Sequence, residues 1–228
     1  MLKFIRFARF CPEHSAFKMA KRKSERFPQS SASSKVGSSL KLRIIGGRFR
    51  GRQIQYSGDP RTRPMKDNVR EAMFNLIGGW IPGKIALDLF AGTGAVGIEA
   101  LSRGASQVFF NERHFPTARL IKQNLDALEP GLPAVIETSD TFFWVRQFLK
   151  SAASLPQDPW VIFCCPPYRL YQTQREELMA MIESLLAAAP LQSVMVVESD
   201  ESFDCSQLPR ASEWRIRQYR PAQIAVWR

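Results

Sequence analysis

The 228-residue sequence predicts an α/β protein with a mostly parallel sheet that is covered by helices on both faces. Three observations support this prediction. Apolar runs of strand length alternate with helical runs between residues 85 and 198, a glycine-rich turn follows the first of these strands, and two alternating segments close the chain. Such alternation is typical of parallel sheets, because each helix returns the chain to the edge where the next strand begins.

The expected elements follow one another in a regular order. Residues 42–46 and 52–55 predict a short N-terminal β-hairpin, and residues 66–77 an amphipathic helix. The alternating series then comprises strands at 85–90, 107–111, 133–137, 160–164 and 193–198, and helices at 95–103, 116–128, 141–150 and 172–187. Segments 214–219 and 223–227 flank Arg220-Pro221 and predict a closing antiparallel hairpin.

The turn after the strand at 85–90 carries the most informative residues. Gly92 and Gly94 let the backbone turn sharply and approach a ligand closely. Asp88 interrupts a buried strand near its carboxyl end, where open α/β sheets bind ligands. Glu112 follows Gly94 by 18 residues, and a carboxylate at this distance accepts hydrogen bonds from ribose in nucleotide-binding units. We therefore predict a nucleotide site; the alternative is a loop cap at Asp88 and a solvated surface charge at Glu112.

A second motif ends the strand at 160–164. Residues 160–168 read Trp-Val-Ile-Phe-Cys-Cys-Pro-Pro-Tyr. The two prolines end the buried strand, because proline cannot donate the backbone hydrogen bond that a central strand needs. Here the chain resembles the class I S-adenosylmethionine-dependent methyltransferases, whose amino-methylating members carry Asp or Asn before Pro-Pro and Tyr or Phe.

Further motifs narrow the resemblance. They are Arg43-Ile-Ile-Gly-Gly-x-x-Arg-Gly51, Arg63-Pro-x-x-x-x-Val-Arg-Glu-x-x-Phe-Asn75, Leu87-Asp-Leu-Phe-Ala-Gly-x-Gly94 and Glu99-Ala-Leu-Ser-Arg-Gly-Ala105. In this order they resemble the bacterial family that methylates the exocyclic amine (N2) of a guanine in small-subunit ribosomal RNA. The resemblance covers about residues 42–228 and implies a Rossmann-like sheet of seven strands, one of them antiparallel.

The resemblance also implies a site. S-adenosylmethionine would be held by Asp88, Phe90, Gly92, Gly94, Glu112 and Asp140. The target base would be held by Cys165, Pro166, Pro167 and Tyr168, with carbonyl oxygens of the proline turn accepting from the amine and Tyr168 stacking on the ring. The predicted function is therefore methyl transfer to RNA.

The sequence departs from the family pattern at Cys165, Met65 and Trp160. Cys165 stands where the family has Asp or Asn, and a thiol is a poor hydrogen-bond acceptor. The alternative function is thus a catalytically impaired cofactor- and RNA-binding protein of ribosome assembly. Cys165 itself is either a weakened contact or a small residue filling the strand end. A nucleophilic role, as in carbon-5 pyrimidine methyltransferases, is disfavoured because Cys165 precedes Pro166.

Charge is distributed unevenly along the chain. Lys and Arg total 32 against 21 Asp and Glu, but residues 1–70 alone hold 18 basic and 4 acidic residues. This skew predicts phosphate contacts, and the alternative is a solvated basic face. The proposed RNA-binding residues are Arg43, Arg48, Arg50, Arg52, Arg63 and Arg70.

These observations divide the chain into three parts. We expect a disordered basic arm at 1–40, an RNA-contacting hairpin and helix at 41–79, and the methyltransferase domain at 80–228. The first 18 residues also resemble a transit peptide, and Met19 is an alternative start. Four cysteines and two histidines show no metal spacing, so we expect reduced thiols and no metal. No apolar run is long enough to span a bilayer. We expect a cytoplasmic protein that is a monomer.

Overall fold

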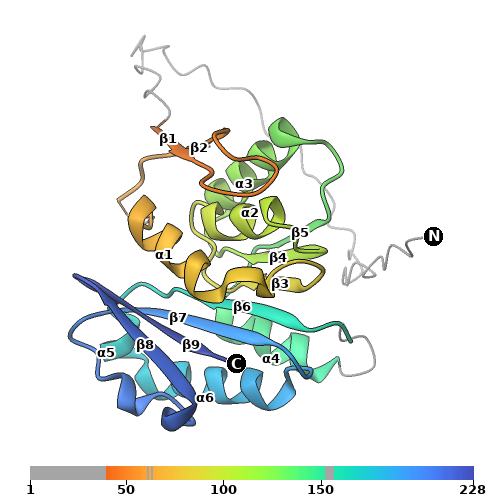
Figure 1. Cartoon of the computed structure of the whole chain (residues 1–228). Helices are drawn as coiled ribbons and strands as arrows, with labels where there is room; N and C mark the ends of the chain where they lie inside the picture. Colours follow the sequence, from red (N-terminus) through yellow and green to blue (C-terminus); the bar gives the residue numbers. More distant parts are fainter. Residues whose placement is uncertain (1–39, 61, 63, 152–156) are drawn as a thin grey trace, which may run out of the picture. The chain divides into compact units, whose positions relative to one another are not determined.

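A seven-stranded sheet, in the order β5-β4-β3-β6-β7-β9-β8, carries the fold (Figure 1). Its strands are β3 (Ile85–Asp88), β4 (Gln107–Asn111), β5 (Ala134–Glu137), β6 (Trp160–Cys164), β7 (Val194–Asp200), β8 (Trp214–Tyr219) and β9 (Ala222–Trp227). β3 to β7 pair in parallel, and β9 is antiparallel to both β7 and β8. The predicted mostly parallel sheet with its closing antiparallel hairpin is confirmed.

This computed structural model describes residues 40–60, 62, 64–151 and 157–228. The predicted basic arm at 1–40 lies outside the described residues, except for Leu40, which begins β1 (Leu40–Arg43). In the described part of the chain, no helix is both long enough and apolar enough to cross a membrane.

Helices cover both faces of the sheet (Figure 1). α1 (Asp67–Ile77), α2 (Ala95–Ser102) and α3 (Phe115–Leu128) lie over one face, and α4 (Thr141–Lys150) and α6 (Arg175–Ala188) over the other. The single helix predicted at 172–187 is instead two helices, a short α5 (Leu170–Thr173) and α6. Gln174 separates them because its backbone, at φ −139° and ψ 34°, is not helical. Short 3₁₀ turns lie at Gly78–Trp80, Cys205–Gln207 and Ala211–Glu213.

The strands alternate between two hydrophobic cores. Ala86 faces the core under α1, α2 and α3, whereas Ile85 and Leu87 face the core under α4 and α6. All five residues of β6 are buried, which explains its uninterrupted apolar sequence. Cys164 and Cys165 belong to opposite faces, as expected for neighbours at a strand end.

The N-terminal hairpin packs directly onto the helices. β1 pairs with β2 (Gln53–Tyr56) as a separate two-stranded sheet, and Ile44, Phe49 and Ile54 enter the same core as α1 and α2. The described residues from Leu40 onward belong to one compact unit, so the boundary expected at residue 79 is not a structural division. The hairpin is an extension of the sheet's own core.

Candidate functional site

The carboxyl ends of four parallel strands bring the candidate site together. Asp88 stands opposite Phe110 of β4 and Phe163 of β6, and Cys164 stands opposite Val197 of β7. The ends of β3, β4, β6 and β7 therefore lie along one edge of the sheet. This is the edge at which open α/β sheets bind ligands.

Asp88 is the buried carboxylate of this edge. Its side chain is 2% exposed, and Oδ2 accepts a hydrogen bond from the Gly97 N–H at 2.9 Å. Burial raises its pKa to about 7, the charge of Glu112 adds to the shift, and the bond from Gly97 opposes it. A cationic ligand group beside Asp88 would favour the ionised form.

The glycine turn adopts the conformation that the sequence predicts. Gly92 and Gly94 have φ values of 51° and 75°, in the left-handed region that side chains disfavour. The Glu112 carboxylate closes this turn, because Oε2 accepts from the Gly92 N–H and Oε1 from the His114 N–H, both at 2.8 Å. Asp88, Gly92, Gly94 and Glu112 thus come together as expected, while their contact with a ligand stays a prediction.

A polar network that sequence reasoning missed supports the neighbouring loop. Asn111 is 1% exposed, and its Nδ2 donates to Ser139 Oγ at 3.0 Å. Thr141 Oγ1 lies 2.8 Å from both Asn111 Oδ1 and the Leu89 carbonyl. The network fixes the start of α4, where Asp140 accepts from the Phe143 N–H at 3.1 Å. An asparagine at the end of an apolar strand was the signal that could have revealed it.

Phe90 and Asp140, predicted to contact the cofactor, have structural contacts of their own. The Phe90 ring packs edge-on against Phe142, with centroids 6.3 Å apart. Asp140 is exposed and caps α4. Their roles toward a cofactor stay predictions.

Cys165 lies half-buried just after β6. Burial raises the pKa of its thiol well above the ordinary value, and the charges of Glu198 and Asp88 raise it further. The sulfur therefore stays protonated near neutral pH, which argues against a nucleophilic thiolate.

One carbonyl of the proline turn, expected to accept a hydrogen bond from the target amine, is already paired within the protein. The Pro167 carbonyl accepts from the Leu170 N–H at 2.8 Å. The Tyr168 hydroxyl donates to Glu198 Oε1 at 2.6 Å. Burial, together with this bond, raises the pKa of Tyr168, so the phenol stays neutral. Tyr168 is thereby held in one orientation, and the proposed stacking of its ring on a base stays a prediction.

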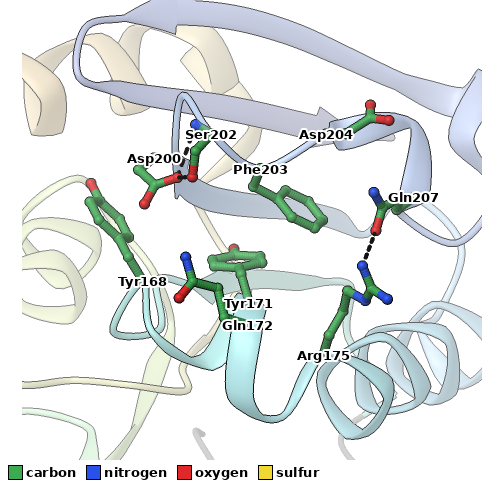
Figure 2. A pocket seen from close by; sticks show the side chains of 9 residues that line it. All are labelled: Tyr168, Tyr171, Gln172, Arg175, Asp200, Ser202, Phe203, Asp204 and Gln207. Atoms are coloured by element: carbon green, nitrogen blue, oxygen red, sulfur yellow. Dashed lines mark hydrogen bonds between the residues drawn. The ribbon is translucent and has the colours of Figure 1, made fainter.

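A pocket of about 300 Å³ adjoins Tyr168 (Figure 2). Tyr168 and Asp200 stand on one side of it and Arg175 and Gln207 on the other, with the paired rings of Tyr171 and Phe203 between them. Arg175 Nη1 donates to Gln207 Oε1 at 3.0 Å. The hollow lies on the β7 side of the sheet edge, beside the predicted base site and apart from the glycine turn.

The predicted RNA-binding arginines do not behave alike. Arg70 is 1% exposed and donates from Nη2 to the Arg43 carbonyl at 2.6 Å and to Asp67 at 2.9 Å. The prediction that Arg70 contacts RNA is therefore wrong for this structure, because the side chain lies inside the protein. Arg63 falls outside the described residues.

The other four arginines remain at the surface, and three of them have partners within the protein. Arg52 donates to the Leu128 and Ala127 carbonyls at 2.6 and 2.7 Å, which satisfies the carboxyl end of α3. Arg48 pairs with Glu129 at 3.0 Å. Arg43 and Arg50 are exposed, and Arg43 lies 4.0 Å from Asp67. Arg43 and Arg50 are the better candidates for phosphate contacts.

Glu99, missed by sequence reasoning as a functional residue, attaches the hairpin to α2. It is 1% exposed and accepts from the Ile45 N–H at 2.8 Å, the Gly46 N–H at 2.7 Å and Arg103 Nε at 2.8 Å. The Asn124 side chain similarly exchanges two hydrogen bonds with the Gln55 backbone, at 2.8 and 2.7 Å. The basic hairpin is therefore held rigidly beside the sheet.

Comparisons with known proteins agree with this architecture. A family model described as Conserved hypothetical protein 95 matches residues 42–228. The Ribosomal RNA small subunit methyltransferase D of Escherichia coli K12 is 29% identical over 187 residues, which cover 82% of this chain and 88% of that protein.

Solved structures share the fold. A hypothetical protein of Thermus thermophilus matches with a TM-score of 0.64 and 24% identity, over 82% of this chain and 98% of that chain. The SAM-dependent methyltransferase of Agrobacterium tumefaciens matches with a TM-score of 0.62 and 13% identity, over 86% of this chain and 71% of that chain. At these identities the likeness concerns the fold alone.

Proposed function

The chain belongs to the family described as Conserved hypothetical protein 95, and we propose that it transfers a methyl group from S-adenosylmethionine to the N2 amine of a guanine in small-subunit ribosomal RNA. The relative in Escherichia coli is named as a methyltransferase of this RNA, and its alignment covers 82% of this chain. The substrate is ribosomal RNA, free or in an assembling subunit.

The residues present suit the cofactor. A buried carboxylate at Asp88, two left-handed glycines and the turn-closing carboxylate of Glu112 lie together at the sheet edge. We assign the methionine end of the cofactor to Asp88 and the glycine turn, the ribose to Glu112, and the adenine to Phe90 and Asp140. When bound, the cofactor supplies a methyl group that its sulfonium has already activated.

The chain's own residues then need only position the acceptor. Tyr168 stands at the adjoining strand end, and its ring is oriented by the bond to Glu198. Holding the amine in line at near-attack distance accounts for several orders of magnitude in rate, without a covalent nucleophile. A base in a duplex must first be unstacked to reach this edge.

A single observation carries the proposal: the glycine turn with its two carboxylates and the Pro-Pro-Tyr turn lie at one sheet edge, on adjoining strands. The test is methyl transfer to small-subunit RNA from cells that lack this modification, followed by nuclease digestion and mass spectrometry. We expect N2-methylguanosine. Cofactor and RNA binding without any methyl transfer would instead support the impaired assembly protein.

A further inference from the structure

With Cys165 at this position, the predicted base site lacks a strong hydrogen-bond acceptor for the target amine. The family resemblance implies that a carboxylate or carboxamide at this position accepts a hydrogen bond from the target amine. A neutral thiol accepts hydrogen bonds only weakly. The thiol pKa is raised by burial and by the charges of Glu198 and Asp88, so the sulfur does not become a charged acceptor. If the amine is oriented by a carboxylate, another residue must provide it.

Glu198 is placed to do so. β6 and β7 pair in parallel with Cys164 opposite Val197, so Cys165 and Glu198 follow as neighbours on adjacent strands. Side chains alternate along a strand, and both residues lie on the face of Phe163 and Val196. The influence of the Glu198 charge on the Cys165 thiol agrees with this proximity.

The Glu198 carboxylate is buried and held in place. It is 9% exposed, and Oε1 accepts from the Tyr168 hydroxyl at 2.6 Å. Its backbone carbonyl accepts from the Tyr171 hydroxyl at 2.7 Å. No described residue donates to Oε2, and this atom is not among the fully buried atoms that lack a partner. One oxygen of a fixed carboxylate thus has no donor among the described residues and is not fully buried.

Asp88, the other carboxylate near Cys165, is committed elsewhere. It accepts from the Gly97 N–H at 2.9 Å and belongs to the glycine turn assigned to the cofactor. Asp200 lines the pocket of Figure 2, and its Oδ1 accepts from Ser202. Glu198 is the carboxylate that lies next to both Cys165 and Tyr168.

We propose that Oε2 of Glu198 accepts the hydrogen bond of the guanine amine and replaces the acceptor that Cys165 cannot provide. Tyr168 then has two tasks, to anchor the carboxylate through its hydroxyl and to pack against the base with its ring. This inference rests on the proposed function, because it names the residue that recognises the amine of that substrate. A site built around such an acceptor discriminates against a base that lacks the amine.

The first experiment measures single-turnover methyl transfer to undermethylated small-subunit RNA. Glu198→Gln should be at least tenfold slower than wild type, because its amide either loses the Tyr168 anchor or presents a donor to the amine. Cys165→Asp added to Glu198→Gln should restore most of the rate, since the carboxylate returns to the position expected in the family. Tyr168→Phe, which keeps the ring, should show a smaller loss. Glu201→Gln, at an exposed residue just past β7, is the matched control and should behave as wild type.

Binding of S-adenosylhomocysteine, measured by calorimetry, should stay within twofold of wild type in every variant and so exclude misfolding. The proposal is overturned if Glu198→Gln retains the wild-type rate, or if the double variant is no faster than Glu198→Gln.

A second experiment separates this inference from the proposed function. In the presence of S-adenosylhomocysteine, ligand-observed NMR compares guanosine with inosine, which lacks the amine. Wild type should bind guanosine about tenfold more tightly, and Glu198→Gln should bind the two alike. If wild type transfers no methyl group yet prefers guanosine through Glu198, the proposed function fails and the amine site stands. Equal binding of both nucleosides by wild type overturns the amine site.

Discussion

Asp88 is expected to make the stability of the ligand-free protein depend on pH in an unusual direction. Its pKa lies at about 7 in the fold and near 3.8 in an unfolded chain, because burial disfavours the charge. Between these values the folded protein binds more protons than the unfolded chain, so the free energy of unfolding falls as pH rises from about 4 to 7. The shift of about three pH units corresponds to a loss of about 4 kcal/mol, at 1.36 kcal/mol per unit.

The assay is urea unfolding, followed by circular dichroism at pH values from 4 to 8, on wild type and Asp88→Asn without cofactor. Asparagine keeps an acceptor for the Gly97 N–H but cannot ionise. The stability of wild type minus that of the variant should therefore fall by about 4 kcal/mol across this range. The subtraction removes the other buried carboxylates, including Glu137 and Glu198, whose pKa values burial also raises.

A difference that stays constant within about 1 kcal/mol from pH 4 to 8 would refute the reasoning, because it would show that Asp88 has no raised pKa. At pH 8 the same variant should bind S-adenosylhomocysteine more weakly than wild type. It should nevertheless be the more stable of the two, because its fold does not hold the buried charge of Asp88. Such a trade between stability and binding is common at functional sites.

Three further outcomes are expected. Glu99→Ala should lower the free energy of unfolding by about 3–5 kcal/mol in urea titrations, because two backbone N–H groups and the Arg103 guanidinium lose a buried acceptor. Glu112→Ala should weaken S-adenosylhomocysteine binding by about 1–3 kcal/mol in calorimetry, through lost charge-assisted hydrogen bonds and a loosened turn at Gly92. Changing Arg43 and Arg50 together to Gln should reduce the slope of log affinity against log salt by about 1.5 in RNA filter binding.

The stability prediction for Glu99 and the salt prediction for the arginines each have a matched control. Glu176, exposed in the first turn of α6, should tolerate Ala with little change in stability. Arg215 and Arg217 on β8 are exposed, and their double change to Gln should leave the salt slope near that of wild type. An equal reduction in both arginine pairs would show that overall charge, rather than the hairpin surface, sets RNA affinity.

Much of the fold could be predicted from the sequence because it depends on local pattern. Buried parallel strands such as β6 are apolar throughout, and the helices between them show the helical repeat of apolar residues. Each element can therefore be recognised from its own segment of sequence. The glycine turn was equally local, since Gly92 and Gly94 need left-handed backbone that few other residues adopt. Asp88 and Glu112 could be placed together because consecutive parallel strands end at one edge.

Only the tertiary structure decided what the charged residues do. Arg70 and Arg50 read alike in a basic segment, yet Arg70 is buried against the Arg43 carbonyl and Arg50 is exposed. The roles of Glu99 and Glu198 depend on distant partners, since Glu99 accepts from Gly46, 53 residues away, and Glu198 from Tyr168, 30 residues away. The apolar periodicity of a helix or strand does not show whether a charged side chain is buried. Its burial depends on partners that folding brings from distant segments. The sequence by itself thus determined the sheet and the cofactor edge, whereas packing between segments determined which carboxylates and arginines are available to a substrate.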